Sequence, residues 1–112
     1  MTGTHIIIDI YDIQDNEILK YESTITPILE KIVEKYNLNV VKKAIYQFQP
    51  FGVTGVYILA ESHLSIHTFV EERKAALDLY TCTKFTNVDD LEIFFKSFFS
   101  NNCELSFKII ER

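Results

Sequence analysis

The chain has 112 residues, of which 47% are hydrophobic and 24% are charged, and its formal net charge at pH 7 is −5. A chain of this length fits one domain, which can bury a core without disulfides or a metal, although self-association would help it. The negative charge argues against a general nucleic-acid binder, which needs a basic face, and is compatible with a cationic substrate. We expect one globular domain with no nucleic-acid partner.

The two cysteines, Cys82 and Cys103, form neither a CxxC pair nor a Cys/His array with the spacing of zinc ligands, so no metal is predicted. Both are expected to be reduced thiols. The opening MTGTHIIIDIYD lacks the basic region and apolar stretch of a signal peptide, and the apolar runs are too short to span a bilayer. These features predict a soluble, cytoplasmic protein with no membrane partner.

The first half of the chain predicts a strand, a helix and two further strands. The isoleucine-rich segment 5–11 is typical of a buried strand. Segment 25–36 is predicted to be a helix, because its apolar residues trace one helical stripe: Ile25, Ile28, Leu29, Ile32, Val33 and Tyr36. Its start signals are Ser23, Thr26 and Pro27, since proline is tolerated in the first turn of a helix. Strands are predicted over 40–48 and 53–60, separated by Pro50 and Gly52.

The second half predicts two more strands, a helix and a last strand. The strands cover 64–69 and 75–82, with a polar turn at 71–74 between them. A helix is expected over 88–100, where Asn87 can cap it and Asp89 and Asp90 suit its positive end. Its apolar face comprises Val88, Leu91, Phe94, Phe95, Phe98 and Phe99. The alternation of Cys103, Leu105, Phe107 and Ile109 predicts the final strand.

The predicted order is β-α-β-β-β-β-α-β. The connections between the middle strands are short, and short connections require antiparallel neighbours, because parallel pairs need long crossovers. The fold class is therefore α+β, an antiparallel β-sheet with two helices packed on one face. The other face must be covered or polar, which makes a dimer plausible.

One stretch of the predicted sheet gathers reactive side chains. Ser62 lies at a tight junction between two strands, between Glu61 and His63, and His67 follows five residues later. Cys82 ends a further strand. A hydroxyl, an imidazole and a thiol are thus expected to converge at one end of the sheet. Each also has an ordinary explanation, since serine is common in turns, strand histidines are often structural, and a buried cysteine is usually a small hydrophobe.

The motif ESHLSIHT, followed at this spacing by ALDLYTC, resembles the signature of the prokaryotic S-adenosylmethionine decarboxylases, a pyruvoyl-dependent class of proenzymes. The upstream segment FQPFGVTG and the opening GTHIIIDIYD are similar to the same family. The resemblance covers nearly the whole chain. It implies a self-processing decarboxylase, a carboxy-lyase that converts S-adenosylmethionine to the aminopropyl donor for spermidine and other polyamines.

The resemblance also implies how the chain would process itself. Ser62 Oγ attacks the carbonyl carbon of Glu61, and His67, the processing base, removes the Cα proton of Ser62. Elimination and hydrolysis then leave a pyruvoyl group in place of Ser62, at the start of an α chain of residues 62–112, beside a β chain of residues 1–61. An imidazole suits the role of base because it titrates near neutral pH. The family further implies a homodimer of αβ pairs with sites at the interface.

In turnover, the resemblance implies a Schiff base between the pyruvoyl carbonyl and the substrate amine, with the pyruvoyl group as electron sink. Cys82 matches the family's proton donor, whose thiol titrates near working pH. Glu71 matches an acidic residue that binds ribose hydroxyls, which a carboxylate can accept. Phe48 falls at an aromatic position near the nucleoside, where a ring can stack on adenine or face the sulfonium cation. Solvent exposure of Glu71 and core packing of Phe48 and Phe69 remain the ordinary alternatives.

Two departures from the family pattern bear on function. Thr54 stands where the family usually has a serine that assists processing; it keeps the hydroxyl but restricts χ1. Phe69 and Val70 stand where the family usually has Trp-Pro, so Phe69 offers a smaller stacking ring beside Glu71. The second departure keeps an alternative open, a pyruvoyl-dependent arginine or ornithine decarboxylase of the same fold. An inactive binding or regulatory homologue is disfavoured by the joint presence of Glu61, Ser62, His67 and Cys82.

Overall fold

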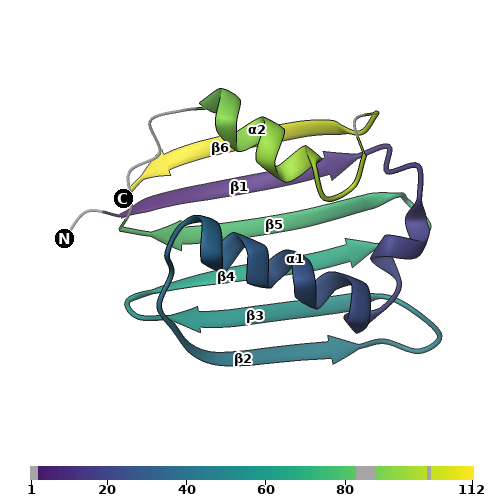
Figure 1. The fold of residues 1–112 in the computed structure, drawn as a ribbon, viewed down its shortest axis with the longest axis horizontal. Coiled ribbons are helices and arrows are strands. Elements are labelled where there is room, and N and C mark those ends of the chain that lie inside the picture. Colours follow the sequence, from purple (N-terminus) through teal and green to yellow (C-terminus); the bar gives the residue numbers. More distant parts are fainter. Residues whose placement is uncertain (1–2, 83–87, 101) are drawn as a thin grey trace.

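The computed structural model describes residues 3–82, 88–100 and 102–112. Six antiparallel strands form one sheet in the order β2-β3-β4-β5-β1-β6, and both helices cover the same face of it (Figure 1). The strands are β1 Thr4–Tyr11, β2 Val40–Gln47, β3 Val53–Leu59, β4 Ser62–Phe69, β5 Lys74–Thr81 and β6 Glu104–Glu111. The predicted α+β class, with its antiparallel sheet and two helices on one face, is confirmed.

Helix α1, Glu22–Lys35, crosses the middle of the sheet, while α2, Val88–Lys96, lies over β1 and β6 (Figure 1). A short 3₁₀ helix, η1 (Asn16–Leu19), precedes α1. The α1 stripe packs as predicted, with Ile25, Ile28, Leu29 and Ile32 buried. Gly55 of β3 allows the close approach of α1, because a Cβ there would lie 3.0 Å from Leu29 Cδ1. None of the helices in the described ranges is long and apolar enough to cross a membrane.

The helix boundaries differ from those predicted. Helix α1 begins three residues before Ile25, so Pro27 lies inside the helix rather than near its start. Thr24 accounts for part of this shift, because its hydroxyl donates to the carbonyls of Ile18 and Tyr21 and fixes the entry turn. Helix α2 ends at Lys96 rather than Ser100, and residues 97–99 continue as turns with hydrogen bonds such as Phe99 N to Lys96 O, 3.1 Å. The proposed cap, Asn87, lies outside the described residues.

The other predicted elements are confirmed, with ends that move by one or two residues. The change that bears on the site is in β4, which begins at Ser62 rather than Leu64, so the connection between β3 and β4 is a turn at 60–61. Leu91, Phe95 and Phe99 of the predicted second-helix face are buried. The final strand starts at Glu104, one residue after Cys103.

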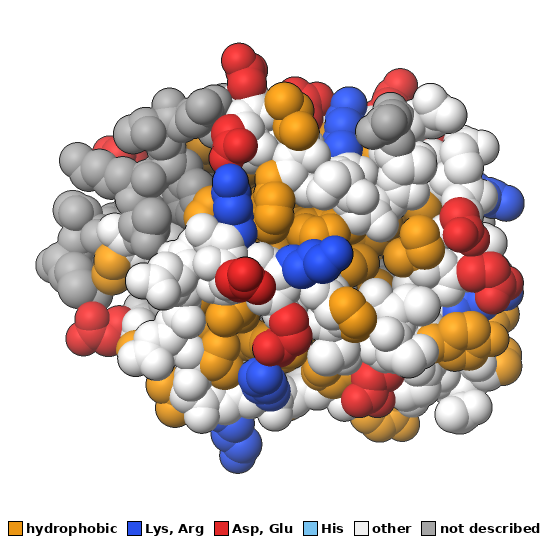
Figure 2. Space-filling view, in the orientation of Figure 1, with side chains coloured by type: hydrophobic (Ala, Val, Ile, Leu, Met, Phe, Trp, Pro, Cys, Tyr) orange, Lys and Arg blue, Asp and Glu red, His pale blue; other side chains and the backbone are white. Residues whose placement is uncertain are grey.

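The two faces of the sheet differ in composition. Buried apolar residues alternate along β1, β4 and β5 and pack beneath the helices. Outside that layer the helices carry acidic and basic side chains interspersed with apolar ones (Figure 2). The alternate strand residues form the face away from the helices, which we call the open face, and these are polar or partly exposed apolar side chains. Ile7 and Val56 remain 38% and 37% exposed there.

Candidate active site

The reactive residues fall at opposite ends of β4. Ser62 is its first residue, whereas His67 comes five residues later and close to its end. Because an extended strand rises about 3.3 Å per residue, these two residues lie roughly 17 Å apart along one chain. The expectation that serine, imidazole and thiol converge at one end of the sheet is therefore wrong within a single chain. The short sequence separation of Ser62 and His67 was misleading, because five residues cover a much greater distance in an extended strand than in a turn.

We call the group at the start of β4 the cleavage half-site; it contains Glu61, Ser62 and Cys82. Glu61 occupies the tight turn between β3 and β4 with φ of 63°, a left-handed conformation that costs a non-glycine residue about 1–2 kcal/mol. Other turn residues, such as Asp12 and Arg73, share this conformation. The Ser62 hydroxyl donates to the carbonyl oxygen of Ala60 at 3.3 Å, across the Glu61 turn.

Cys82 belongs to the same end of the sheet as Ser62. It directly follows β5, and the register that pairs His63 with Tyr80 brings the end of β5 beside the start of β4. Cys82 is exposed, whereas Cys103 is buried and its thiol donates to the carbonyl of Ser100 at 2.9 Å. Burial raises the pKa of the Cys103 thiol, which keeps it protonated and unreactive. Of the two thiols, Cys82 is the one placed for chemistry.

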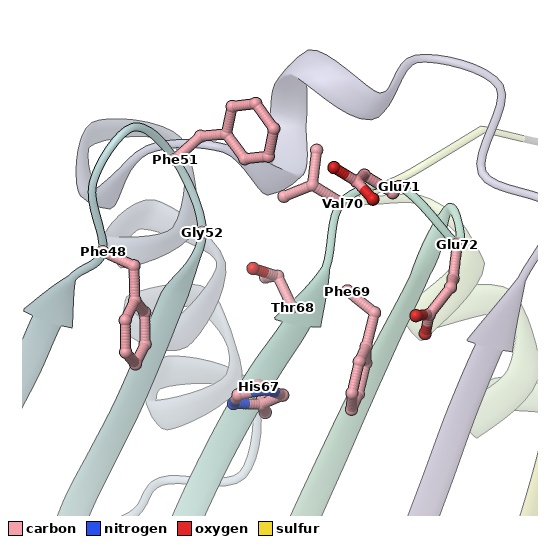
Figure 3. Close-up of a pocket in the computed structure, with 9 residues that line it drawn as sticks. All are labelled: Phe48, Phe51, Gly52, His67, Thr68, Phe69, Val70, Glu71 and Glu72. Carbon is pink, nitrogen blue, oxygen red and sulfur yellow. The ribbon is translucent and has the colours of Figure 1, made fainter.

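The histidine half-site lies at the other end of β4 and contains Phe48, Thr54, His67, Phe69 and Glu71. Thr54 of β3 pairs directly with His67 of β4, and Thr54 Oγ1 lies 2.6 Å from Nδ1 of the imidazole. The ring centroids of His67 and Phe69 are 4.5 Å apart in an edge arrangement, and Phe48 lies 6.5 Å from His67. The imidazole is thus held by one hydrogen bond and flanked by two rings (Figure 3).

A hollow of about 370 Å³ opens beside these rings. Its wall includes Phe51 and Val70, with Glu71 and Glu72 on the turn at its rim (Figure 3). Aromatic walls beside a carboxylate suit a ligand that combines a flat ring or a cation with hydroxyl groups. Phe48, Phe69 and Glu71, the three residues expected to bind the substrate, all line this pocket. Phe51, Val70 and Glu72 were not predicted as lining residues.

The loop that carries Phe48 is held by a residue that sequence reasoning missed. The Gln47 amide donates from Nε2 to the carbonyls of Lys20 and Gly52, at 2.8 and 3.1 Å, and its Oε1 accepts from Glu22 N at 2.6 Å. It therefore ties the end of β2 to the start of α1. Gly52, with φ of 111°, closes the loop by accepting a hydrogen bond from Phe48 N at 2.8 Å. No motif in the sequence marks these long-range contacts.

Comparisons with known proteins point to one family. The family model described as S-adenosylmethionine decarboxylase matches residues 4–112. A protein of Picrophilus torridus named S-adenosylmethionine decarboxylase proenzyme is 40% identical over 87 residues, which are 78% of this chain and 66% of that protein. A protein of the same name from Archaeoglobus fulgidus is 38% identical over 89 residues, 80% of this chain and 79% of that one.

The fold has a counterpart among solved structures. The crystal structure of the adenosylmethionine decarboxylase from Aquifex aeolicus matches with a TM-score of 0.77 and 32% identity, over 95% of this chain and 88% of that chain. In sequence, the aligned region spans just under two thirds of the Picrophilus protein and 58% of a curated Aquifex relative. The family model nevertheless covers all but the first three residues of this chain. The chain belongs to the S-adenosylmethionine decarboxylase family.

Proposed function

We propose that this chain is a proenzyme that cleaves itself between Glu61 and Ser62 and then decarboxylates S-adenosylmethionine. The observation that carries the proposal is the Glu61–Ser62 turn at the head of β4, in a chain that belongs to this family. A serine directly after a left-handed turn residue places a hydroxyl next to the peptide bond that must break. The product would be the aminopropyl donor for spermidine synthesis.

Self-cleavage uses only side chains encoded in this sequence, from one copy of the chain or two, and water. Ser62 Oγ bonds to the Glu61 carbonyl carbon, the peptide C–N bond breaks, and the amide becomes an ester. The His67 imidazole then takes the Cα proton of Ser62, and the Cβ–O bond breaks, which releases Glu61 as a carboxylate. Water replaces the nitrogen of the remaining dehydroalanine as ammonia leaves, and this yields the pyruvoyl group. Thr54 supports the step by holding the imidazole through Nδ1.

The separation of the half-sites supports a homodimer with composite sites. His67 lies roughly 17 Å from Ser62 in its own chain, too far for proton transfer. If the open faces of two copies stack about a two-fold axis perpendicular to β4, one β4 is reversed against the other, so the start of β4 in one copy meets the end of β4 in its partner. Partly exposed apolar residues such as Ile7 and Val56 on this face suit burial at such an interface. Each site would combine one cleavage half-site with the other chain's histidine half-site.

In the mature enzyme, the pyruvoyl group supplies the electron sink for loss of carbon dioxide. The exposed Cys82 thiol lies at the same end of the sheet and donates a proton to the substrate α carbon. Phe48 and Phe69 hold the adenine or the sulfonium against their rings, and Glu71 accepts hydrogen bonds from the ribose hydroxyls.

The mass of the purified protein tests cleavage. We expect fragments of residues 1–61 and 62–112, the second with a blocked end, and we expect Ser62→Ala to remain intact because it lacks the attacking oxygen. Appearance of both fragments from Ser62→Ala would place the cleavage elsewhere. Release of carbon dioxide from S-adenosylmethionine, arginine and ornithine then tests the substrate. Release of carbon dioxide from arginine or ornithine but not from S-adenosylmethionine would favour the alternative of an arginine or ornithine decarboxylase, which Phe69 and Val70 leave open.

Mixing two inactive variants tests the composite site. Ser62→Ala and His67→Ala should each fail to process alone. Coexpressed, they form mixed dimers in which the intact Ser62 of one chain meets the intact His67 of the other. We expect the His67→Ala chain, and only that chain, to be cleaved in such dimers. Cleavage of neither chain would show that each site is built within one protomer.

A further inference from the structure

A second cluster of polar side chains lies on the open face, near the start of β4 and outside the residues assigned above. It joins three neighbouring strands, through His5 of β1, Asp78 of β5 and His63 of β4. His63 Nε2 lies 3.2 Å from Asp78 Oδ2, while His5 Nε2 hydrogen-bonds to the other carboxylate oxygen, Oδ1. One carboxylate therefore accepts from two imidazoles, one on each oxygen.

The cluster is packed against an aromatic ring on one side, while the side chains of His63 and Asp78 remain 39% and 35% exposed. The Tyr80 ring lies 5.7 Å from the His5 ring and 6.0 Å from the His63 ring, and the guanidinium of Arg112 lies over the Tyr80 ring at 5.4 Å. Gly3 approaches the same ring so closely that a Cβ there would lie 2.6 Å from it. These neighbours restrict the motion of the His5 and His63 rings. The cluster can therefore hold the backbone at the start of β4, to which His63 belongs.

His63 is attached to the reacting residue, because it directly follows Ser62. Before cleavage the turn holds Ser62 in place, but cleavage of the Glu61–Ser62 bond makes residue 62 a chain end. Chain ends fray unless they are tied down. The remaining ties at residues 62 and 63 are the ladder pairs Leu59–Ser62, Ile58–His63 and His63–Tyr80 and the side-chain bond from His63 to Asp78.

We propose that Asp78 is a positioning residue, which holds the start of β4 through His63 and is itself oriented by His5. This inference rests on the proposed function, because it assumes that residue 62 is the reacting centre. In the part of the chain that the structure describes, Asp78 forms hydrogen bonds and ion pairs with His5 and His63, and with neither Ser62 nor a residue of the pocket that contains Phe48 and Glu71. Its effect should therefore fall on the rate of the chemical steps and not on substrate binding.

The decisive variant is Asp78→Asn. It preserves the shape, but an amide offers one acceptor oxygen where the carboxylate offers two, so only one of the two imidazoles can still donate its N–H to residue 78. We expect self-cleavage to slow by about tenfold or more, the size expected for loss of a hydrogen bond to a charged group. After processing is complete, kcat should fall similarly while KM stays within about twofold of the parent value. His63→Ala should match this, and His63→Gln, which keeps an N–H donor, should recover part of the rate.

Asp9→Asn is the matched control. Asp9 lies on β1 of the same open face, its side chain is 30% exposed against 35% for Asp78, and it forms an ion pair with Lys74 at 3.7 Å. The Asp9→Asn substitution removes the same negative charge but no hydrogen bond to His5 or His63. Its rates of self-cleavage and decarboxylation should therefore stay near those of the parent. Equal slowing in Asp9→Asn and Asp78→Asn would assign the effect to the charge of the face and overturn the inference.

The double variant His63→Ala/Asp78→Asn tests whether the two residues act as one unit. If they do, it should be no more than about twofold slower than the slower single variant, because the second change removes nothing further. Multiplicative slowing would overturn the inference. These rates are measured on variants that keep the circular dichroism of the parent; if Asp78→Asn fails to fold, the His63→Ala and His63→Gln pair carries the test.

Two further results separate the alternatives. The atoms of His5, His63 and Asp78 that could bind a metal all lie within 4.8 Å of one another, so the assays are repeated with a chelator. Loss of activity with chelator and recovery with Zn²⁺ would make the cluster a metal site and overturn the positioning role. A parent chain that never cleaves refutes the proposed function, whereas parental rates in Asp78→Asn refute only this inference.

Discussion

Thr54 Oγ1 lies 2.6 Å from Nδ1 of His67, across a directly opposed pair of residues on β3 and β4. For Nε2 to accept a proton, Nδ1 must carry the imidazole hydrogen and donate it to the threonine oxygen. The contact is compatible with that tautomer, because the threonine hydroxyl can accept as well as donate a hydrogen bond. The imidazole contacts the hydroxyl oxygen, a group that threonine and serine share.

Replacing Thr54 tests this relationship. Thr54→Val has nearly the same shape but no hydroxyl, so the imidazole loses its partner, and self-cleavage should slow by about tenfold. Thr54→Ser keeps the hydroxyl and gains χ1 freedom, so it should cleave within a few-fold of the parent. The time course of intact chain on denaturing gels gives both rates. Equal rates for the valine and serine variants would show that the hydroxyl plays no part.

His67→Ala should stop processing after the acyl shift, because nothing then removes the Cα proton of Ser62. The Glu61–Ser62 link would persist in part as an ester, which hydroxylamine cleaves and an amide resists. Treatment of the purified variant with hydroxylamine should therefore release a fragment ending at Glu61. The double variant Ser62→Ala/His67→Ala is the control, and it should resist the reagent. An intact His67→Ala chain that also resists would mean that the histidine acts earlier, in the acyl shift itself.

Cys82→Ala should separate processing from turnover. The role proposed for this thiol begins only after the pyruvoyl group exists, so both fragments should form at close to the parental rate while decarboxylation falls by at least about a hundredfold. Cys103→Ala is the matched control in the buried thiol, and its effect should be on thermal stability rather than on the catalytic rate. Parental decarboxylation by Cys82→Ala would remove the thiol from the mechanism.

The sequence predicted the local elements well and the arrangement of the site poorly, for one physical reason. The apolar stripe of α1, the alternation in β4 and β5 and the turn before Ser62 each depend on residues that are close together in the sequence. The order of the strands, with β1 between β5 and β6, depends on pairing between distant segments. So do the Gln47 contacts to Lys20 and the cluster that joins His5 to His63. The length of β4 sets the distance between Ser62 and His67, whereas their spacing of five residues in the sequence had suggested that the two side chains lie together.

A pH titration tests the packing of α1 against α2. Burial, and then the charge of Asp90, raise the pKa of Tyr36 from 10.0 to about 12, and its ring contacts Phe94 edge-on at 5.8 Å. A phenol whose pKa is higher in the folded state contributes stability that is complete below pH 10 and is lost as the pH rises through 12. The parent should therefore lose stability between pH 10 and 12 more steeply than Tyr36→Phe. Urea unfolding across this range measures the difference, and parallel curves would contradict the assigned burial.

The last prediction concerns the substrate, through Glu71 on the turn after β4. If the substrate carries a ribose, its hydroxyls donate to this carboxylate, and leaving them unpaired in a desolvated site would cost roughly 1–3 kcal/mol, or about ten- to hundredfold in kcat/KM. Glu71→Gln should impair turnover of S-adenosylmethionine by that amount and leave self-cleavage intact. Glu72→Gln, the neighbouring carboxylate on the rim of the same pocket, is the control and should have the smaller effect.

An arginine or ornithine decarboxylase could also use Glu71, to hold the distal cation of its substrate. Competition in the parent enzyme therefore decides between the two substrate classes. A non-reactive analogue that contains adenosine should inhibit, because Phe48 and Phe69 offer their rings to the nucleoside whether or not the amino acid part can react. If the analogue fails to bind while arginine or ornithine is decarboxylated, the nucleoside roles of Phe48, Phe69 and Glu71 fall together. The pyruvoyl chemistry at Ser62 would remain, because it depends on the other end of β4.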